Sequence, residues 1–435
     1  MSDMSFLDPA TMTDPFEFHR RARAATPVLK LGREGLEDIY LVTTRALINE
    51  VTQNVRDFSN DITHLLFEGI GQNPEADRLL ENSWNRFALL LPADDPQHKR
   101  HRSLVNGVFT GVRVSKWAPA MERIVDELID DFIGDGECDF FRQFAKLLPT
   151  YVVADILGFE RRYYDHVIKW SDAIISRVSR MGTREQEVEA TRQIIEMEQF
   201  IDAEIKKRHE NPGDDLISAL IAIRVDGEPP LSDVEMGPLV REIMVAGNET
   251  TRNTLASGIV RLLRNPDQLN ELVADESLIA NAVEELLRFE TPATSMWRVT
   301  TRQLELGGVQ IPKGAAINLR FDSANRDENT FSDPETFNIH RNNARDHYAF
   351  GAPGIHRCLG QMLARKELCI ALPKLLGRLK NLHLVEEKSN LNYWAGLLHR
   401  GIGSVFLQFD PGPKVTRTSE GDERVVIGSA KARSI

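Results

Sequence analysis

The stretch that decides the fold lies in the C-terminal part of the chain and reads Phe350-Gly351-Ala352-Pro353-Gly354-Ile355-His356-Arg357-Cys358-Leu359-Gly360. Cys358 has a glycine four residues before it, another two residues after it, and a histidine two residues before it. Glycine lets the backbone turn sharply and approach a flat ligand closely. A thiolate in such a loop suits the axial position of a haem iron, but a free cysteine is often simply a small buried hydrophobic residue. The loop by itself leaves both interpretations open.

The composition is that of a large, acidic globular protein. The chain has 435 residues, 42% of them hydrophobic, and a net charge of −12, so we expect no nucleic-acid partner. Its three cysteines, an odd number, argue against a disulfide framework and for a reducing compartment. The polar, acidic N-terminus has no signal-peptide pattern, and no run of ~20 apolar residues predicts a membrane anchor. We therefore expect a cytoplasmic protein.

The hydrophobic pattern predicts a mainly α-helical fold with small β-sheets. Helical spacing dominates from about residue 97 to about residue 275, and a long helix is expected to begin at Ser232-Asp233 and to end near Leu263. Strands are expected over 39–42, on both sides of the turn at Gly307-Gly308, and over 403–409.

No linker divides the chain. We therefore expect a single domain over residues 1–410. The polar segment 411–435 is expected to form a disordered tail.

The middle of the long predicted helix contains a second unusual stretch, Ala246-Gly247-Asn248-Glu249-Thr250-Thr251. Gly and Thr are poorer helix formers than Ala or Leu, and a Thr hydroxyl can bond back to the carbonyl four residues earlier and bend the helix. Local frustration of this kind is expected where residues serve function. Taken alone, the stretch also fits an ordinary surface helix with two threonines.

Two pairs of charged residues complete the pattern. Glu285 and Arg288 are three residues apart, so they share a helix face and can pair, although such pairs are common and weak. His98 and Arg102 are four residues apart and offer two cationic or hydrogen-bonding groups on one face, which suits a ligand with carboxylates. The alternative for the segment 98–102 is a basic surface patch.

Together and in this order, the four motifs resemble those of the cytochrome P450 family, soluble bacterial type, over about residues 15–409. The resemblance implies the P450 fold and haem b, with Cys358 as the metal ligand. It also implies that His98, Arg102, Arg298 and His356 bind the haem propionates.

The same resemblance implies roles for the two remaining motifs. Glu249 and Thr250 match the catalytic acid–alcohol pair that delivers protons for oxygen activation, with Glu where Asp is often found. Glu285 and Arg288, joined by Arg341, would have a structural role, since they would lock the irregular segment that positions the cysteine loop.

One feature departs from the family pattern. Phe350 lies eight residues before Cys358, one more than is common in the family, so that Ala352-Pro353 carries an extra residue. Pro fixes φ and lacks an amide hydrogen, and amides near a thiolate tune its donor strength. The extra residue therefore bears on how Phe350 packs in the loop.

The resemblance places a mainly apolar substrate pocket over the haem, which suits a hydrophobic small molecule. Each residue of its expected wall is, by itself, as consistent with an ordinary core position. The stretch around Glu249 is similar to that of bacterial P450s that act on steroids and lipids, which points to a sterol, terpenoid or fatty-chain substrate. The expected wall comprises Phe87, Leu90, Val245, Ala246, Ala293, Met296 and Leu397.

As a P450 monooxygenase, the protein would use O2 and electrons from NAD(P)H. A separate reductase and a ferredoxin-type protein would deliver them, because the chain has no flavin or iron–sulfur segment. A basic proximal face would attract an acidic ferredoxin. Two alternatives are a peroxide-driven P450 and a haem-binding sensor or carrier without catalysis. The residues expected on the basic face are Arg113, Arg357 and Arg365, with Lys99, Arg100 and His101.

Overall fold

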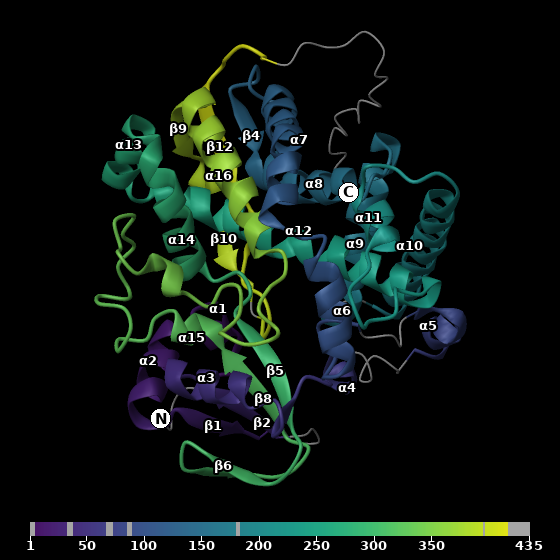
Figure 1. The fold of residues 1–435 in the computed structure, drawn as a ribbon. Coiled ribbons are helices and arrows are strands. Elements are labelled where there is room, and N and C mark those ends of the chain that lie inside the picture. Colours follow the sequence, from purple (N-terminus) through teal and green to yellow (C-terminus); the bar gives the residue numbers. More distant parts are fainter. Residues whose placement is uncertain are drawn as a thin grey trace.

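The computed structural model describes residues 5–32, 38–66, 73–84, 89–179, 183–394 and 396–415. These residues form a helix-rich fold with small sheets, as the sequence predicts (Figure 1). The helices of the N-terminal half are α1 (Pro9–Thr13), α2 (Phe16–Ala25), α3 (Arg45–Gln53), α4 (Thr63–Leu66), α5 (Pro74–Leu79), α6 (Gln97–Asn106), α7 (Gly111–Asp130), α8 (Leu147–Ile156), α9 (Tyr164–Ser179) and α10 (Arg184–Glu210). Those of the C-terminal half are α11 (Leu216–Ala222), α12 (Asp233–Leu263), α13 (Pro266–Ala274), α14 (Ile279–Glu290), α15 (Phe321–Ala324) and α16 (Gln361–Arg378).

The largest sheet joins segments from both halves of the chain. β2 and β8 are parallel, with Leu41 opposite Asn318, and the other neighbouring strands are antiparallel. Figure 1 shows this sheet at the bottom of the view, next to α2, α3 and α15. The strands, in the order β1-β2-β8-β5-β3, are β1 (Val28–Leu31), β2 (Ile39–Val42), β8 (Ala316–Arg320), β5 (Ser295–Thr300) and β3 (Phe58–Ser59).

The strand–turn–strand expected around Gly307-Gly308 is present. β6 (Leu304–Leu306) and β7 (Val309–Ile311) pair antiparallel, and the two glycines have φ of 54° and 79°, the left-handed values that this tight turn needs.

The segment 403–409 is extended as expected, but it forms two strands and not one. They are β11 (Ile402–Ser404) and β12 (Phe406–Asp410), which belong to different sheets. Val405 lies between them, and its carbonyl accepts a bond from the Phe140 amide (2.8 Å), next to the pairing of β12 with β4. β11 pairs with β10 (Asn390–Tyr393), and β12 lies between β4 (Glu137–Asp139) and β9 (Lys380–Leu384).

The long helix α12 crosses the centre of the molecule (Figure 1). At its start, the amide and the hydroxyl of Ser232 both donate to Glu235 Oε2 (2.8 Å each), so the Glu235 side chain caps the helix. Its buried residues occur along its whole length and on several sides, which is typical of a helix enclosed by others. α12 is continuous through Glu249-Thr250.

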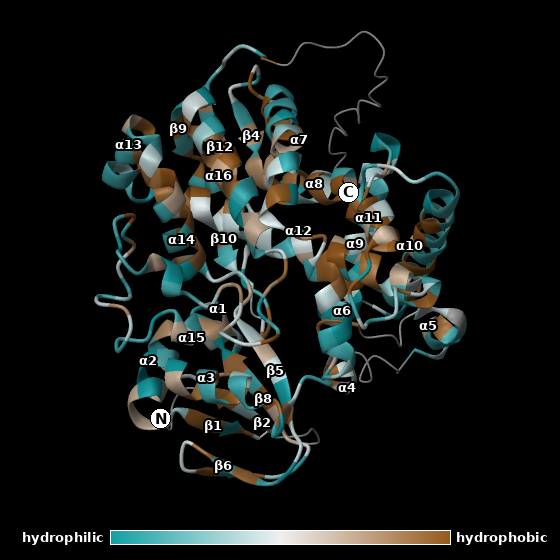
Figure 2. Ribbon diagram, in the orientation of Figure 1, coloured by the Kyte–Doolittle hydropathy of each residue, from teal (hydrophilic) through white to brown (hydrophobic). Residues whose placement is uncertain are grey.

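Hydrophobic residues gather where the helices meet. In Figure 2, α8 is mostly hydrophobic, whereas α10, at the edge of the helical part, carries hydrophilic residues on its outer side. Residues of α7, α8, α12, α14 and α16 share one large core cluster. A second cluster fills the space between the five-stranded sheet and α3. The cysteine loop and α16 are thus held against a closely packed core.

The residues after β12 continue along α7. The Gly412 amide donates to the carbonyl of Ile133 (3.0 Å), and the Val415 amide donates to Asp130 Oδ1 (3.0 Å). Residues 411–415, which we expected to begin a disordered tail, are therefore hydrogen-bonded in place, and residues 416–435 lie outside the described part of the chain. Within the described ranges, no helix combines the length and the apolar composition that a membrane span requires.

Candidate active site

A single large cavity of about 1830 Å³ brings together most of the predicted site residues. Ligand pockets usually have volumes of about 300–1,000 Å³, so this one has room for a large flat cofactor together with a substrate. Its walls come from α12, the cysteine loop and the start of α16, strand β5, and the segment between β10 and β11.

Cys358 lies in the wall of this cavity, directly before α16. The backbone amides of Gly360 and Gln361 donate to its sulfur and, with the nearby charges of Arg102 and Arg365, favour the thiolate. Burial outweighs them, so that the pKa of the thiol is raised. A cationic group bound to the sulfur would oppose that effect of burial, as metal ligation does.

The extra residue at Ala352-Pro353 leaves Phe350 inside the loop. Phe350 is 9% exposed, and its carbonyl accepts a bond from the Cys358 amide (3.0 Å). Gly351 has a φ of 84°, which turns the chain outward. The Pro353 carbonyl there accepts a bond from Thr52 Oγ1 of α3 (3.1 Å). The insertion therefore adds a contact with α3 and leaves the Phe350–Cys358 backbone bond in place.

The side chains of His98, Arg102, Arg298 and His356 all line the cavity. The rings of His98 and His356 lie 3.8 Å apart, centre to centre. Burial, and then the positive charges of His98, Arg298 and Arg102, lower the pKa of His356 to about 3. Burial also lowers the pKa of Arg298 to about 10.

This cluster of two arginines and two histidines fits the propionates of a haem. Arg102 Nε donates to Asn106 (3.0 Å) and Arg298 Nη1 donates to the Trp297 carbonyl (2.6 Å). Neither arginine has a carboxylate within ion-pair distance among the described residues. Buried positive charges without a counter-charge are unfavourable. A dianionic ligand would supply the missing negative charge. Cys358 lines the same cavity as these four residues.

Glu249 and Thr250 face the same cavity from α12. Thr254 Oγ1, one turn after Thr250, donates to the carbonyl of Thr250 (2.9 Å) and makes a back-bond to the helix. Within the described residues, no hydrogen bond occupies the Thr250 hydroxyl. Glu249 is 8% exposed and has an ion-pair partner that the sequence did not indicate, His399.

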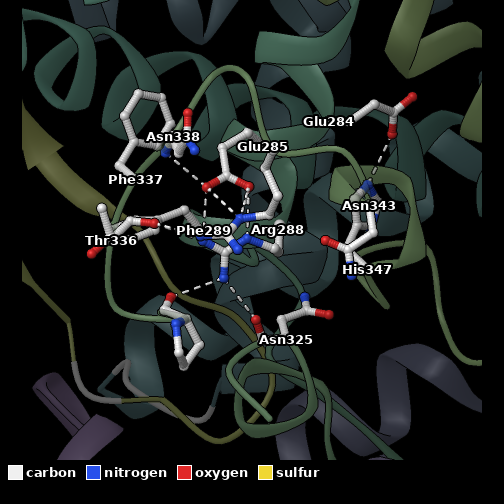
Figure 3. Close-up of polar contacts among 12 residues, drawn as sticks. Glu284, Glu285, Arg288, Phe289, Asn325, Thr336, Phe337, Asn338, Asn343 and His347 are labelled. Carbon is white, nitrogen blue, oxygen red and sulfur yellow. Dashed lines mark hydrogen bonds and ion pairs between the residues drawn. The ribbon is translucent and has the colours of Figure 1, made fainter. Parts of the chain in front are cut away.

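The predicted structural group is assembled as the motif implied (Figure 3). Arg288 Nε and Nη2 donate to the two oxygens of Glu285 (2.7 and 2.8 Å), and Arg341 Nε lies 3.1 Å from the same carboxylate. Arg288 also donates to the carbonyls of Asn325 (2.9 Å) and Pro334 (3.0 Å), which belong to the irregular segment before the cysteine loop. Glu285 and Arg288 are fully buried.

The cavity contains six of the seven expected pocket residues. Phe87 lies outside the described residues. Met296 and Ala293 come from β5 and the turn before it, and Leu397 comes from the segment between β10 and β11. The six are Leu90, Val245, Ala246, Ala293, Met296 and Leu397.

The expected basic face is smaller than predicted. Arg100 and His101 both pair with Glu235, next to the N-terminal end of α12 (His101 Nε2 at 2.8 Å). Arg365 pairs with the buried Glu284 (2.7 Å). The charges of these three residues are locally compensated, so they add little to a positive surface.

Among the charged and titratable groups in the cavity wall that were not predicted, three stand near the predicted site residues or on their helices. His399 contacts Glu249, Arg241 lies two helical turns before Glu249 on α12, and Glu367 is a carboxyl buried in α16. Burial raises the pKa of Glu367 to about 8, so this side chain is mostly uncharged at neutral pH. In the sequence each resembles an ordinary polar residue, and no local signal marks it.

An amide-held thiol, a group of two arginines and two histidines suited to a dianion, and a free hydroxyl beside a buried acid share one cavity, which defines a haem–thiolate enzyme. The chain belongs to the cytochrome P450 family: the family model "Cytochrome P450" matches residues 59–401. It is a P450 monooxygenase, as its named relatives are.

The chain is 38% identical to a steroid C26-monooxygenase of Mycobacterium tuberculosis over 325 residues, covering 75% of this chain and 87% of the relative. It is 35% identical to the 6-deoxyerythronolide B hydroxylase of Saccharopolyspora erythraea over 331 residues, covering 76% of this chain and 80% of the relative. Among solved structures, CYP109E1 from Bacillus megaterium in complex with corticosterone superposes with a TM-score of 0.79 at 27% identity, covering 92% of this chain and 100% of that chain.

Proposed function

We propose that this P450 hydroxylates an elongated, hydrophobic small molecule of the sterol, terpenoid or fatty-chain type. The observation that carries the proposal is the mainly apolar wall of the 1830 Å³ cavity beside Thr250. The named activity of the steroid C26-monooxygenase and the corticosterone bound to CYP109E1 agree with a substrate of this class.

In this proposal, Cys358 ligates the haem iron, and the group formed by His98, Arg102, Arg298 and His356 binds the propionates. When bound, the haem supplies the activation of O2 for insertion of one oxygen atom into a C–H bond. The chain holds the cofactor, excludes water with the apolar wall and positions the substrate above it.

We assign proton delivery to Glu249 and Thr250. The Thr250 hydroxyl is free to donate a hydrogen bond into the cavity, and Glu249 can exchange protons with it through water. Glu285, Arg288 and Arg341 have a structural role, since they hold the segment that leads to the cysteine loop.

Electrons are proposed to come from NAD(P)H through a reductase and a ferredoxin. The docking surface would be the proximal face at the N-terminal ends of α7 and α16, where the apolar side chains of Val112 and Met362 are 74% and 48% exposed. Of the basic residues expected there, Lys99, Arg113 and Arg357 are not among the three with compensated charges, and we propose that they contribute to this face. Residues 1–410 would form the catalytic domain, because β12 at its end pairs with β4 and β9.

The function is tested by titrating the purified haem protein with a sterol, a terpenoid, a fatty acid and a sugar. The apolar ligands are expected to shift the spin state of the haem and the sugar to leave it unchanged. Turnover is then compared with NAD(P)H, reductase and ferredoxin, and with peroxide alone. Product with peroxide only would favour the peroxide-driven alternative, and haem binding without NAD(P)H-linked product would favour a sensor or carrier.

Thr250→Ala is expected to uncouple electron use from product. Removing a proton-transfer group costs about 10²–10⁴-fold in the step that it serves, so most of the NAD(P)H consumed should yield peroxide or water instead of product. Product formed per NAD(P)H consumed is the measurement. Thr254→Ala is a matched control, because its hydroxyl bonds the helix backbone. Equal coupling in wild type and Thr250→Ala would remove Thr250 from the mechanism.

A further inference from the structure

The proposed proton-relay acid is held from a second segment of the chain. Glu249 Oε2 lies 3.1 Å from Nδ1 of His399, and Glu249 Oε1 lies 3.6 Å from an Nη atom of Arg252 on the same helix. Glu249 is 8% exposed. A carboxylate this deeply buried needs partners to remain charged.

The two partners of Glu249 are not equivalent. Arg252 also faces Asp172 of α9 (3.8 Å), and Lys146 in turn lies 2.6 Å from Asp172. Arg252 is thus shared between two carboxylates at long distances. His399 is the closer partner of Glu249, and its contact is within hydrogen-bond range.

The backbone around His399 is firmly placed. The Leu397 carbonyl accepts bonds from Ser295 Oγ (2.6 Å), Arg320 Nη1 (2.8 Å) and Thr294 Oγ1 (3.2 Å). His399 itself forms an isolated β-bridge with Ala293. These contacts fix the position from which the imidazole reaches Glu249, in the same short segment that carries Leu397 into the substrate cavity.

Burial favours the uncharged form of Glu249, but His399 and then Arg252 oppose it, so that the pKa of Glu249 lies below its ordinary value. Without His399, burial would be opposed chiefly by the shared Arg252. The pKa of Glu249 is then expected to rise.

We propose that His399 is a positioning residue of the proton relay, which holds the Glu249 carboxylate from the substrate-lining segment between β10 and β11. This inference rests on the proposed function of Glu249. It adds a residue from outside α12, and it links the wall of the substrate pocket to the group that handles protons. No bond is made or broken by His399 in this role.

The test uses His399→Leu, which removes the imidazole and its hydrogen bond to Glu249, and His399→Asn, whose side-chain amide can still donate. His383→Leu is a matched control, because His383 is an exposed histidine of β9, outside the cavity wall, that bonds Gln408 (3.2 Å). The first readout does not involve turnover: infrared spectra of the haem protein across pH, with the Glu249 carboxyl band assigned by its loss in Glu249→Gln. The second is product per NAD(P)H across pH.

In His399→Leu, the protonated carboxyl band of Glu249 is expected at higher pH than in wild type. Coupling should fall about tenfold, less than the ~100-fold lower bound for removing the proton-transfer group itself. His399→Asn should recover most of the coupling, and His383→Leu should match wild type in both measurements.

An unchanged Glu249 band in His399→Leu would overturn this inference, and so would coupling equal to wild type in both His399 variants. Failure of the underlying function is recognised separately. If Glu249→Gln itself couples like wild type, then Glu249 is not the relay acid, whatever His399 does.

Discussion

Cys358→Ser is expected to abolish monooxygenase turnover while the chain still folds. The sulfur lies at the start of α16, where the amides of Gly360 and Gln361 donate to it. A serine hydroxyl would keep the size and the hydrogen bonds, but it is far less acidic and is a poor iron ligand. We expect a loss of more than ~100-fold, the upper range for changes in residues that merely support a metal ligand.

The measurement is the absorption spectrum of the reduced protein with carbon monoxide. Wild type should show the red-shifted band of a thiolate ligand, and Cys358→Ser should lack it. Cys369→Ser is the matched control, because Cys369 lies on α16, directly after the cysteine loop, but is not part of the cavity wall. A thiolate-type band that persists in Cys358→Ser would mean that another residue holds the iron.

The sequence predicted those parts of the site that depend on residues close together in the chain. The cysteine loop combines the proposed ligand, its turn-forming glycines and a helix start within a short stretch, so Cys358 can be proposed as the ligand without a structure. Glu285 and Arg288 are one helical turn apart, and the structure brings them together as their spacing implied.

The parts that the sequence did not predict depend on tertiary contacts. His399 reaches Glu249 only because β-bridge and side-chain bonds place its segment against β5 and α12. Glu367 looks like a solvated residue of an amphipathic helix, and its burial follows from how α16 packs. Arg100 and His101 were misplaced on a basic surface, because their partner Glu235 lies on a different helix.

The division of the segment 403–409 into two strands could not be predicted for a related reason. A continuous apolar run predicts extended backbone but not the sheet to which each residue belongs. The residues before Val405 pair with β10 and those after it pair with β4 and β9, which the local pattern cannot indicate.

Arg288→Leu is expected to lower the free energy of unfolding by about 3–5 kcal/mol, the cost of removing one partner of a buried ion pair. Arg288 donates five hydrogen bonds, two to Glu285 and three to the carbonyls of Asn325, Pro334 and Thr336. The substitution would leave the Glu285 carboxylate with Arg341 and the Asn338 amide only. Since the free energy of unfolding of a whole domain is about 5–15 kcal/mol, such a loss is a large share of the total stability.

The substitution at Arg288 should also disturb the cofactor site. The carbonyls that Arg288 binds belong to the irregular segment that leads into the cysteine loop (Figure 3). We therefore expect Arg288→Leu to bind less haem, in addition to unfolding at lower urea concentration. Arg288→Lys should be intermediate, because lysine keeps the charge but cannot form the paired contact with Glu285.

The matched control is Arg264→Leu. Arg264 also pairs with a glutamate, Glu386 (2.9 Å), but the two side chains are 50% and 64% exposed. An exposed pair contributes about 0–1 kcal/mol, so this variant should unfold close to wild type and bind haem normally. If Arg288→Leu and Arg264→Leu unfold at the same urea concentration, the buried Glu285–Arg288 pair contributes no more to stability than the exposed pair. The cysteine loop would then be held in place by other contacts.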